Sequence, residues 1–299
     1  MSIATTTAPA TVAIERRHRL PYDEYLRDFL IPRRPVIITG TLDDWPASKW
    51  TPDTLRKQYG ASTVHIKDQP TTLGEFLDRV ERSTADNPVP YLRDQILKDV
   101  HPDIIADVTP FHPYIFPNWL HGRYLPKSVS YQLNRPSNLE LFIGGLGTKL
   151  GELHYDFAHC HVALAQLYGR KQFWVYPPEQ SQYLYPTGMM SAIKDVEHPD
   201  LEKYPLFAKA VATTFVQEPG EIAVLPTGWW HTTRLLGTSI AVAINFANAT
   251  NWNDVVDDVC QDLVDRRPRI GGAYRTWLRL RGLGKRMGGR DLGRATMFR

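Results

Sequence analysis

The sequence predicts a mainly β protein with flanking helices, built around a sandwich or barrel of the jelly-roll type. The main observation is a series of short β runs in the second half of the chain, most of them bounded by Gly, Pro or Asn. Short, evenly spaced strands of this kind are typical of a jelly roll. The runs cover residues 128–133, 139–143, 152–156, 161–167, 172–176, 213–216, 221–225, 231–236 and 239–246.

The composition fits one large globular domain or two modest ones, because 42% of the 299 residues are hydrophobic. A net charge of only +3 gives no reason to expect nucleic acid as a partner of the whole chain. Two cysteines provide no disulfide framework, so we expect a reducing, cytoplasmic location. No uncharged apolar run approaches the length of a membrane span, and no membrane association is expected.

The first part of the chain predicts helices and one buried strand, packed on the β core. Residues 1–14 are rich in Thr and Ala and are expected to form a disordered tail. Residues 15–127 then carry apolar residues at helical spacing, with Thr51 as a helix N-cap. The predicted elements are helices over 21–30, 51–59 and 73–82, a strand over 35–40, and aromatic-rich loops with short helices over 88–126.

The β runs define a core domain over residues 128–250, interrupted by an insert, 178–212, that is expected to cover one mouth. Residues 251–299 have a helical pattern in which aspartates come first and arginines follow. One interpretation of this basic region is a solvated helix pair with a frayed tail. The other is a surface for an acidic partner or for a homodimer, because apolar residues recur along it.

His154 and Asp156 lie two residues apart on a predicted strand, so their side chains point to the same face. His231 begins a later strand and can supply a second imidazole there. Two histidines and one carboxylate on one face of a metal leave coordination positions open, which is typical of non-haem Fe(II) oxygenases. A His-x-Asp pair alone is a weak signal, and the β context strengthens it.

Lys171 begins a largely apolar strand, where an unpaired ammonium group is costly to bury. A dicarboxylate co-substrate would provide its partner, since the ammonium is a compact point charge for a carboxylate. The alternative is that the side chain reaches the rim and keeps its charge in water.

Several segments together make the chain resemble the JmjC/cupin-like oxygenases that depend on Fe(II) and 2-oxoglutarate, over roughly residues 20–250. The small hydroxylases of that family, which modify Asn, Asp, Lys or Arg side chains, are nearest in layout. The segments that carry the resemblance are 34–40, 44–47, 154–156, 166–171, 176–178 and 225–231.

The resemblance implies a double-stranded β-helix in which His154, Asp156 and His231 are the iron ligands. It also implies that Lys171 binds the distal carboxylate of 2-oxoglutarate, with O₂ as the second co-substrate. No other metal is expected: Cys160 cannot easily join the histidines on either side of it at one ion, because neighbouring strand residues alternate faces.

Two further residues match family positions around the co-substrate. Tyr91 matches a tyrosine that hydrogen-bonds the same carboxylate, and Asn245 matches an asparagine close to the co-substrate. Plain core packing is the alternative for Tyr91, and a satisfied structural amide for Asn245. Gly151 stands where many relatives carry a co-substrate-binding Thr, and residues 157–161 also depart from the family pattern, so contacts to 2-oxoglutarate are expected to be rearranged.

The candidate substrate pocket is assigned to aromatic residues and histidines near these motifs. His159 and His161 follow the first two ligands, and Trp230 directly precedes the third. Trp119 belongs to the aromatic-rich loops that would shape the same pocket. For the tryptophans, ordinary packing is the competing interpretation.

The function expected from the sequence is hydroxylation of an unactivated C–H bond in an amino-acid side chain of a protein or peptide. The first alternative is the same chemistry on a free amino acid or a natural-product intermediate. The second is a non-oxygenase cupin, either a metal-dependent isomerase or hydrolase or a binding module. An isomerase or hydrolase would usually need further ligands, for which Glu152 is the nearby candidate.

Overall fold

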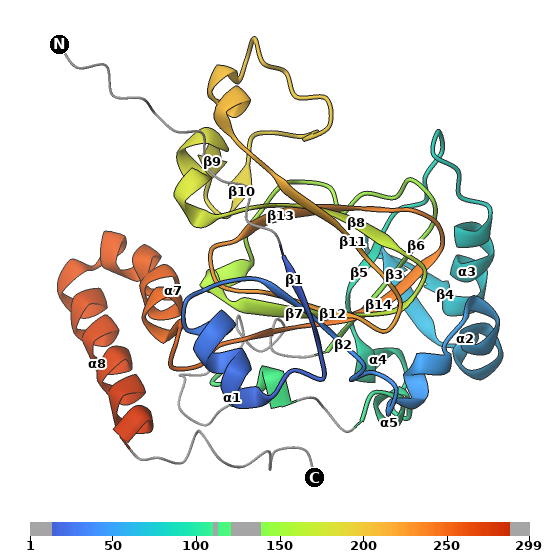
Figure 1. Ribbon diagram of the computed structural model, residues 1–299, viewed down its shortest axis with the longest axis horizontal. Helices are drawn as coiled ribbons and strands as arrows, with labels where there is room; N and C mark the ends of the chain where they lie inside the picture. The colour runs from blue at the N-terminus through green and yellow to red at the C-terminus, as the bar shows by residue number, and fades with distance from the viewer. Residues whose placement is uncertain (1–13, 110–112, 121–138, 288–299) are drawn as a thin grey trace.

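Figure 1 shows the computed structural model of the protein, which describes residues 14–109, 113–120 and 139–287. The predicted fold class is confirmed: two β-sheets form the centre, and helices flank them. The strand predicted over 128–133 lies outside the described residues, as do nearly all of the predicted tail and the end of the basic region.

The larger sheet has seven strands and is antiparallel except for the pairing of its first two strands. The smaller sheet has three strands, all antiparallel. In spatial order the larger sheet contains β1 (Glu15–His18), β2 (Val36–Thr39), β12 (Ile222–Leu225), β7 (His161–Tyr168), β14 (Ser239–Phe246), β6 (Glu140–Gly144) and β5 (Leu92–Ile96), and the smaller sheet contains β11 (Thr213–Gln217), β8 (Lys171–Tyr176) and β13 (Trp230–Leu235).

The space between the two sheets is filled by alternate residues of both. On β7, Val162 and Leu164 point inward and pack with Phe173 and Val175 of β8 in one buried cluster. The intervening Ala163 and its neighbours at the same spacing join a different cluster on the outer face. This period of two is the reason why a strand buried on both faces reads as a continuous apolar run.

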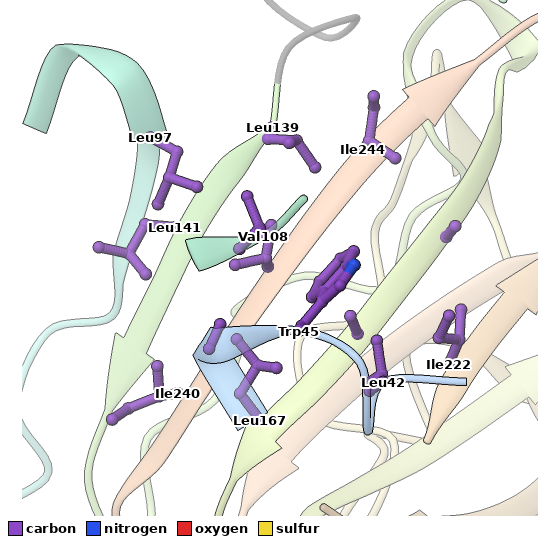
Figure 2. Close-up of a cluster of buried hydrophobic side chains, with 14 of the residues drawn as sticks. Leu42, Trp45, Leu97, Val108, Leu139, Leu141, Leu167, Ile222, Ile240 and Ile244 are labelled. Carbon is purple, nitrogen blue, oxygen red and sulfur yellow. The ribbon is translucent and has the colours of Figure 1, made fainter. Parts of the chain in front are cut away.

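Helices and loops from the N-terminal part cover the outer face of the larger sheet. Figure 2 shows the cluster between these layers, with Trp45 from the loop after β2 over the sheet near Leu167. The covering elements are α1 (Tyr22–Glu24), the π-helix Tyr25–Leu30, the 3-10 helix Pro46–Lys49, α2 (Pro52–Tyr59), the hairpin of β3 (Thr63–Ile66) and β4 (Gln69–Thr72), α3 (Leu73–Glu81), α4 (Leu97–Val100), α5 (Ile104–Asp107) and the 3-10 helix Pro113–Ile115.

The helix starts follow the capping signals in the sequence. The Thr51 side chain accepts from the backbone N–H of Thr54 at the start of α2, which confirms the predicted cap. Thr72 and Glu75 form a reciprocal capping box at the start of α3. Each cap satisfies backbone N–H groups that the first turn leaves without a partner.

The insert contains the 3-10 helices Pro178–Tyr183 and Pro205–Lys209 and a small hairpin of β9 (Pro186–Thr187) and β10 (Met190–Ser191). Its Leu184 and Ile193 share a buried cluster with Tyr176 of β8 and Trp230 of β13. The insert therefore packs on the smaller sheet through an apolar core of its own.

The C-terminal region forms two helices, α7 (Trp252–Arg266) and α8 (Pro268–Met287), which pack against each other. Trp252 anchors them: its ring meets Trp119 edge-on at 5.5 Å, and its indole N–H donates to the Leu278 carbonyl at 3.0 Å. Among the described residues, no helix combines the length and the apolar character needed to cross a bilayer. The domain boundaries inferred from the sequence remain predictions.

Gly169 allows the tight turn between β7 and β8, and we predict that Gly169→Ala strongly destabilises the fold. Its φ is +69°, and an added Cβ would lie 1.9 Å from the Thr238 carbonyl oxygen. Strain plus this clash should lower the free energy of unfolding by roughly 2–4 kcal/mol in a denaturant titration. Gly188, at φ +62° with open space around it, is the matched control, and Gly188→Ala should cost only about 1 kcal/mol. Equal losses of unfolding free energy in the two variants would contradict the predicted clash.

Candidate metal centre

The segment that carries His154 and Asp156 lies between β13 and the insert hairpin. His154 and His231 exchange two backbone hydrogen bonds, with N–H to O distances of 3.1 and 2.7 Å. On the other side, the Tyr155 N–H donates to the Met189 carbonyl and the Ser191 N–H donates to the Leu153 carbonyl. The predicted continuous strand over 152–156 is thus reduced to isolated bridges, but the segment is extended and paired on both sides.

This pairing brings the three predicted ligands together. One donor atom from each of His154, Asp156 and His231 lies within 4.8 Å of the others. The two imidazole rings are 4.4 Å apart, and Asp156 Oδ2 lies 3.7 Å from His231 Nε2. Among the described residues these three side chains form the sole group with metal-ligand spacing.

Each histidine is oriented by a backbone carbonyl two residues earlier in the chain. His154 Nδ1 lies 2.9 Å from the Glu152 carbonyl oxygen, and His231 Nδ1 lies 3.2 Å from the Trp229 carbonyl oxygen. Donation from Nδ1 fixes the tautomer with Nε2 as the free lone pair, which is the arrangement that metal-binding histidines require.

Burial shifts the protonation of all three groups toward the neutral state. Desolvation and the neighbouring His231 lower the pKa of His154 to about 4, and desolvation lowers the pKa of His231 to about 4. Desolvation raises the pKa of Asp156 to about 6. A buried carboxylate beside two neutral imidazoles is a site that a divalent cation would stabilise.

Asn245 contacts the predicted metal site. Its side chain forms a hydrogen bond with the Asp156 carboxylate, which favours the charged form. It lies on β14, on the face that points between the sheets, and its backbone carbonyl accepts from Asn118 Nδ2 at 3.1 Å. The structure therefore gives this amide a ligand-orienting position next to the site, in addition to the co-substrate contact that the resemblance implies.

Lys171 is buried between the sheets without a carboxylate partner among the described residues. Its side chain is among the largest that are almost fully buried, and its exposed fraction is 1%. The ammonium lies 5.9 Å from the ring centres of Tyr91, Phe142 and Phe173. Desolvation lowers its pKa to about 7. Aromatic faces compensate this burial only in part, so the geometry suits an anion that would complete the pairing.

Tyr91 lies beside the Lys171 ammonium, and its hydrogen bond to the co-substrate carboxylate stays a prediction. Phe142 was not predicted, although it is one of the three aromatic residues around the Lys171 ammonium and its ring centre lies 5.7 Å from that of Tyr91. The alternation of residues 139–143 could have placed Phe142 on an inward face, but sequence alone does not say which strand it would meet. Burial keeps the pKa of Tyr91 above its usual value, so the phenol is a hydrogen-bond donor.

Three of the predicted pocket residues lie away from the metal ligands. His161 has no exposed surface: its Nδ1 accepts from the Thr227 N–H, and its Nε2 bonds Thr250 Oγ1 at 2.8 Å. Trp119 packs against the C-terminal helices. Trp230 lies on the face of β13 opposite to His231 and donates to Ser181 Oγ in the insert. The physical reason is packing in each case, together with strand alternation for Trp230.

His159 lies closer to the centre, on a strained turn that follows Asp156. Both Ala158 and His159 have positive φ, at 53° and 51°. The His159 ring packs on Tyr155 at 4.4 Å, and its Nδ1 lies 3.5 Å from Asp258 Oδ2 on α7. This turn joins the ligand segment to the C-terminal helices, so pocket contact by His159 stays a prediction.

Glu152, the candidate extra ligand of an isomerase or hydrolase, is engaged elsewhere. Its carboxylate forms an ion pair with Lys194 of the insert. That bond is the largest cause of its lowered pKa. The carboxylate is therefore turned toward the insert, and the set of donor atoms with metal-ligand spacing contains three residues.

Comparison with known proteins identifies the family. A model described as a cupin-like domain matches residues 21–251. The chain belongs to the cupin-like domain family. This cupin-like protein is 26% identical over 282 residues to the arginine-specific demethylase JMJ20 of Arabidopsis thaliana, covering 84% of the chain and 60% of the relative. It is 29% identical over 251 residues to lysine-specific demethylase 8 of Danio rerio, covering 78% and 58%.

A third relative has a different kind of name. The cupin-like protein is 29% identical over 245 residues to tRNA wybutosine-synthesizing protein 5 of Gallus gallus, covering 75% of the chain and 73% of the relative. The chain spans about three-fifths of the length of the two demethylases. The matches confirm the resemblance to JmjC/cupin-like proteins and support oxygenase chemistry of the Fe(II) and 2-oxoglutarate type.

We predict that metal affinity falls below about pH 6. A metal ion needs Asp156 as a carboxylate, and burial raises its pKa to about 6. Below that pH each bound ion must displace about one proton, so the Kd should rise up to ~tenfold per pH unit. The histidines add to this only near pH 4, because their pKa values are lowered. Calorimetric titration with Mn(II) from pH 5 to 8 tests this. A Kd that stays constant over that range would contradict it, as would a rise much steeper than tenfold per pH unit, which would mean that the histidines also take up protons there.

Proposed function

We propose that this protein is an Fe(II)- and 2-oxoglutarate-dependent dioxygenase that hydroxylates an unactivated C–H bond, with an amino-acid side chain of a protein or peptide as its substrate. The observation that carries the proposal is the pairing of two sites in one sandwich. One is a group of two imidazoles and a carboxylate, and the other is a buried ammonium that faces no carboxylate among the described residues.

The donor set fits iron and a chelating co-substrate. Three protein ligands leave positions on the metal for a bidentate co-acid and for O₂, as in other facial sites of two histidines and a carboxylate. The ammonium of Lys171 fits the second carboxylate of a dicarboxylic acid, because a charged partner offsets the cost of its burial. When bound, iron, 2-oxoglutarate and O₂ supply the oxidising chemistry and yield succinate and CO₂.

The protein's own groups bind, orient and exclude water. The two histidines are held by backbone carbonyls, and Asp156 is held by Asn245. Lys171 and Tyr91 would orient the co-substrate from the interior of the sandwich. The rings around the ammonium keep water from it, which strengthens its attraction for a carboxylate. None of these side chains has to move a proton for the proposed hydroxylation.

The relatives' names support the same reaction class. Removal of an N-methyl group, as in proteins named demethylases, also begins with hydroxylation of a C–H bond, so one site serves both outcomes. A free amino acid or a natural-product intermediate is the alternative substrate. The pairing of Glu152 with Lys194 weighs against an isomerase or hydrolase that recruits this carboxylate as a ligand.

The experiment that tests the proposal is an anaerobic titration with Fe(II) and then 2-oxoglutarate, following the visible charge-transfer band of the chelate. The wild type should show the band and form succinate in air. His231→Ala should lose both, and Lys171→Ala should raise the Kd of 2-oxoglutarate by roughly 30-fold or more, since losing a buried charged partner costs about 2–5 kcal/mol.

The exposed Lys209 of the insert is the matched control, and Lys209→Ala should leave the titration unchanged. Circular dichroism should show that each variant keeps its fold. Iron binding without a band in the wild type would overturn the choice of co-substrate. Undiminished succinate formation in His231→Ala would overturn the ligand assignment.

We also propose that the protein forms a homodimer through its C-terminal helices. On α8, Ile270, Trp277, Leu280 and Leu283 are exposed, which is unusual for large apolar residues on one helix. Truncation near residue 250 would expose the core around Trp252, so substitutions are the better test. Cytoplasmic location also stays a prediction.

For the dimer we predict that the double variant Ile270→Asp, Leu280→Asp halves the mass measured by size exclusion with light scattering, because buried charges oppose association. Leu206, another exposed apolar residue, lies in the insert and is the control, and Leu206→Asp should leave the mass unchanged. A monomeric mass for the wild type would contradict the proposed dimer.

A further inference from the structure

A groove of about 1120 Å³ opens beside β5, the last strand of the larger sheet. β3 and the turn that follows it form one wall, and β5, residues 88–91 and 148–150 and Asp99 of α4 form the rest. Pockets for small molecules usually have volumes of about 300–1,000 Å³ and mostly apolar walls. This groove exceeds that range and is lined mainly by polar side chains, so its size and chemistry suit a segment of a polymer.

The groove adjoins the Lys171 part of the candidate site, although none of the three predicted metal ligands lines it. Tyr91 lines it and also contacts the Lys171 ammonium. Residues 148–150 line it and lead directly into the segment that carries His154 and Asp156, and the Leu150 N–H pairs with Thr233 of β13. A chain lying in the groove would therefore run beside the stretch of chain that leads to two of the predicted metal ligands.

Three residues that line this groove have strained backbone conformations with positive φ. Lys67 and Asp68 form the turn of the β3–β4 hairpin with φ of 49° and 65°, and Asp94 on β5 has φ of 61°. All three residues line the groove. The left-handed conformation is unfavourable for residues other than glycine, and it persists mainly where function or packing demands it.

At the edge of β5, the side-chain amide of Gln95 occupies the place of a backbone peptide group. The side-chain Oε1 of Gln95 accepts from the His65 N–H of β3 at 3.1 Å, and its Nε2 donates to the Arg93 carbonyl at 3.4 Å. A primary amide offers the same donor and acceptor as a backbone peptide. In the described part of the chain no strand pairs with this edge of β5, so an added strand could take over these bonds.

The charges of the groove decide which polymer it fits. Its lining includes the cations Lys67, Arg93 and Lys149 and, in equal number, the anions Asp68, Asp94 and Asp99. Lys149 is already paired with two carboxylates of the insert. A nucleic-acid backbone needs a clear excess of cations, whereas a polypeptide with few charges does not.

We propose that this groove binds an extended polypeptide segment of the substrate, which pairs with the edge of β5 in place of the Gln95 amide and leads the target side chain to the metal. The inference rests on the proposed function and specifies its substrate as a polypeptide. Arg93 lines the groove and would contact the bound peptide.

In the test, the protein is loaded with Fe(II) and 2-oxoglutarate in the absence of oxygen. It is then mixed with two probes, a displayed library of random dodecapeptides and a library of random RNA dodecamers. Peptides should be enriched and RNA should not. The Kd of an enriched peptide, measured by fluorescence polarisation, should rise at least tenfold in Thr63→Trp, which fills the groove from β3. Bound peptide should also slow hydrogen exchange at the amides of β3 and β5.

Thr214 provides the matched control, because it is an exposed threonine on β11, away from the groove. Thr214→Trp should leave the peptide Kd within twofold of the wild type. The inference would be overturned by enrichment of RNA or by failure to enrich any peptide. It would also be overturned if Thr63→Trp left the Kd of the enriched peptide unchanged.

The same samples separate this inference from the proposed function. A chelate band with no groove-dependent peptide binding would overturn the groove alone. Groove-dependent peptide binding without a band would support the groove as a peptide site and overturn the choice of co-substrate.

Discussion

The reciprocal backbone bonds between His154 and His231 are the interaction on which the site depends. They place two residues from distant parts of the chain directly opposite each other, with their rings 4.4 Å apart. Because side chains on a strand alternate, this single register also fixes Asp156 on the same face. A slip of one residue would move Tyr155 to that face and remove both of its ligands.

Most polar groups of the candidate site have specific protein partners. Asp156 has Asn245, each of the two histidines has a carbonyl, and among the described residues Lys171 faces aromatic rings and no carboxylate. That difference separates the two halves of the site. The ligand half is organised within the protein, whereas the ammonium half is left to be completed by a bound anion.

Sequence reasoning placed His154 and Asp156 on one face because the period of a strand alone relates them. The same rule would have placed Trp230 opposite to His231, against the insert. His161 could not be assigned in this way, because its strand is apolar on both faces and the pattern does not say which face is which. The hairpin pairing with Leu153 and Tyr155, and the Gln95 bridge, depend on contacts distant in sequence that no local pattern encodes.

The carbonyl that orients each histidine lies two residues before it in the same segment. Each imidazole thus has its orienting acceptor in its own segment, and Asp156 shares a segment with His154. The complete ligand set, with its orienting acceptors, occupies two short stretches of one antiparallel ladder. A different sandwich with the same strand spacing could therefore host the centre by accepting residues 152–156 and 229–231 together with an amide in the place of Asn245.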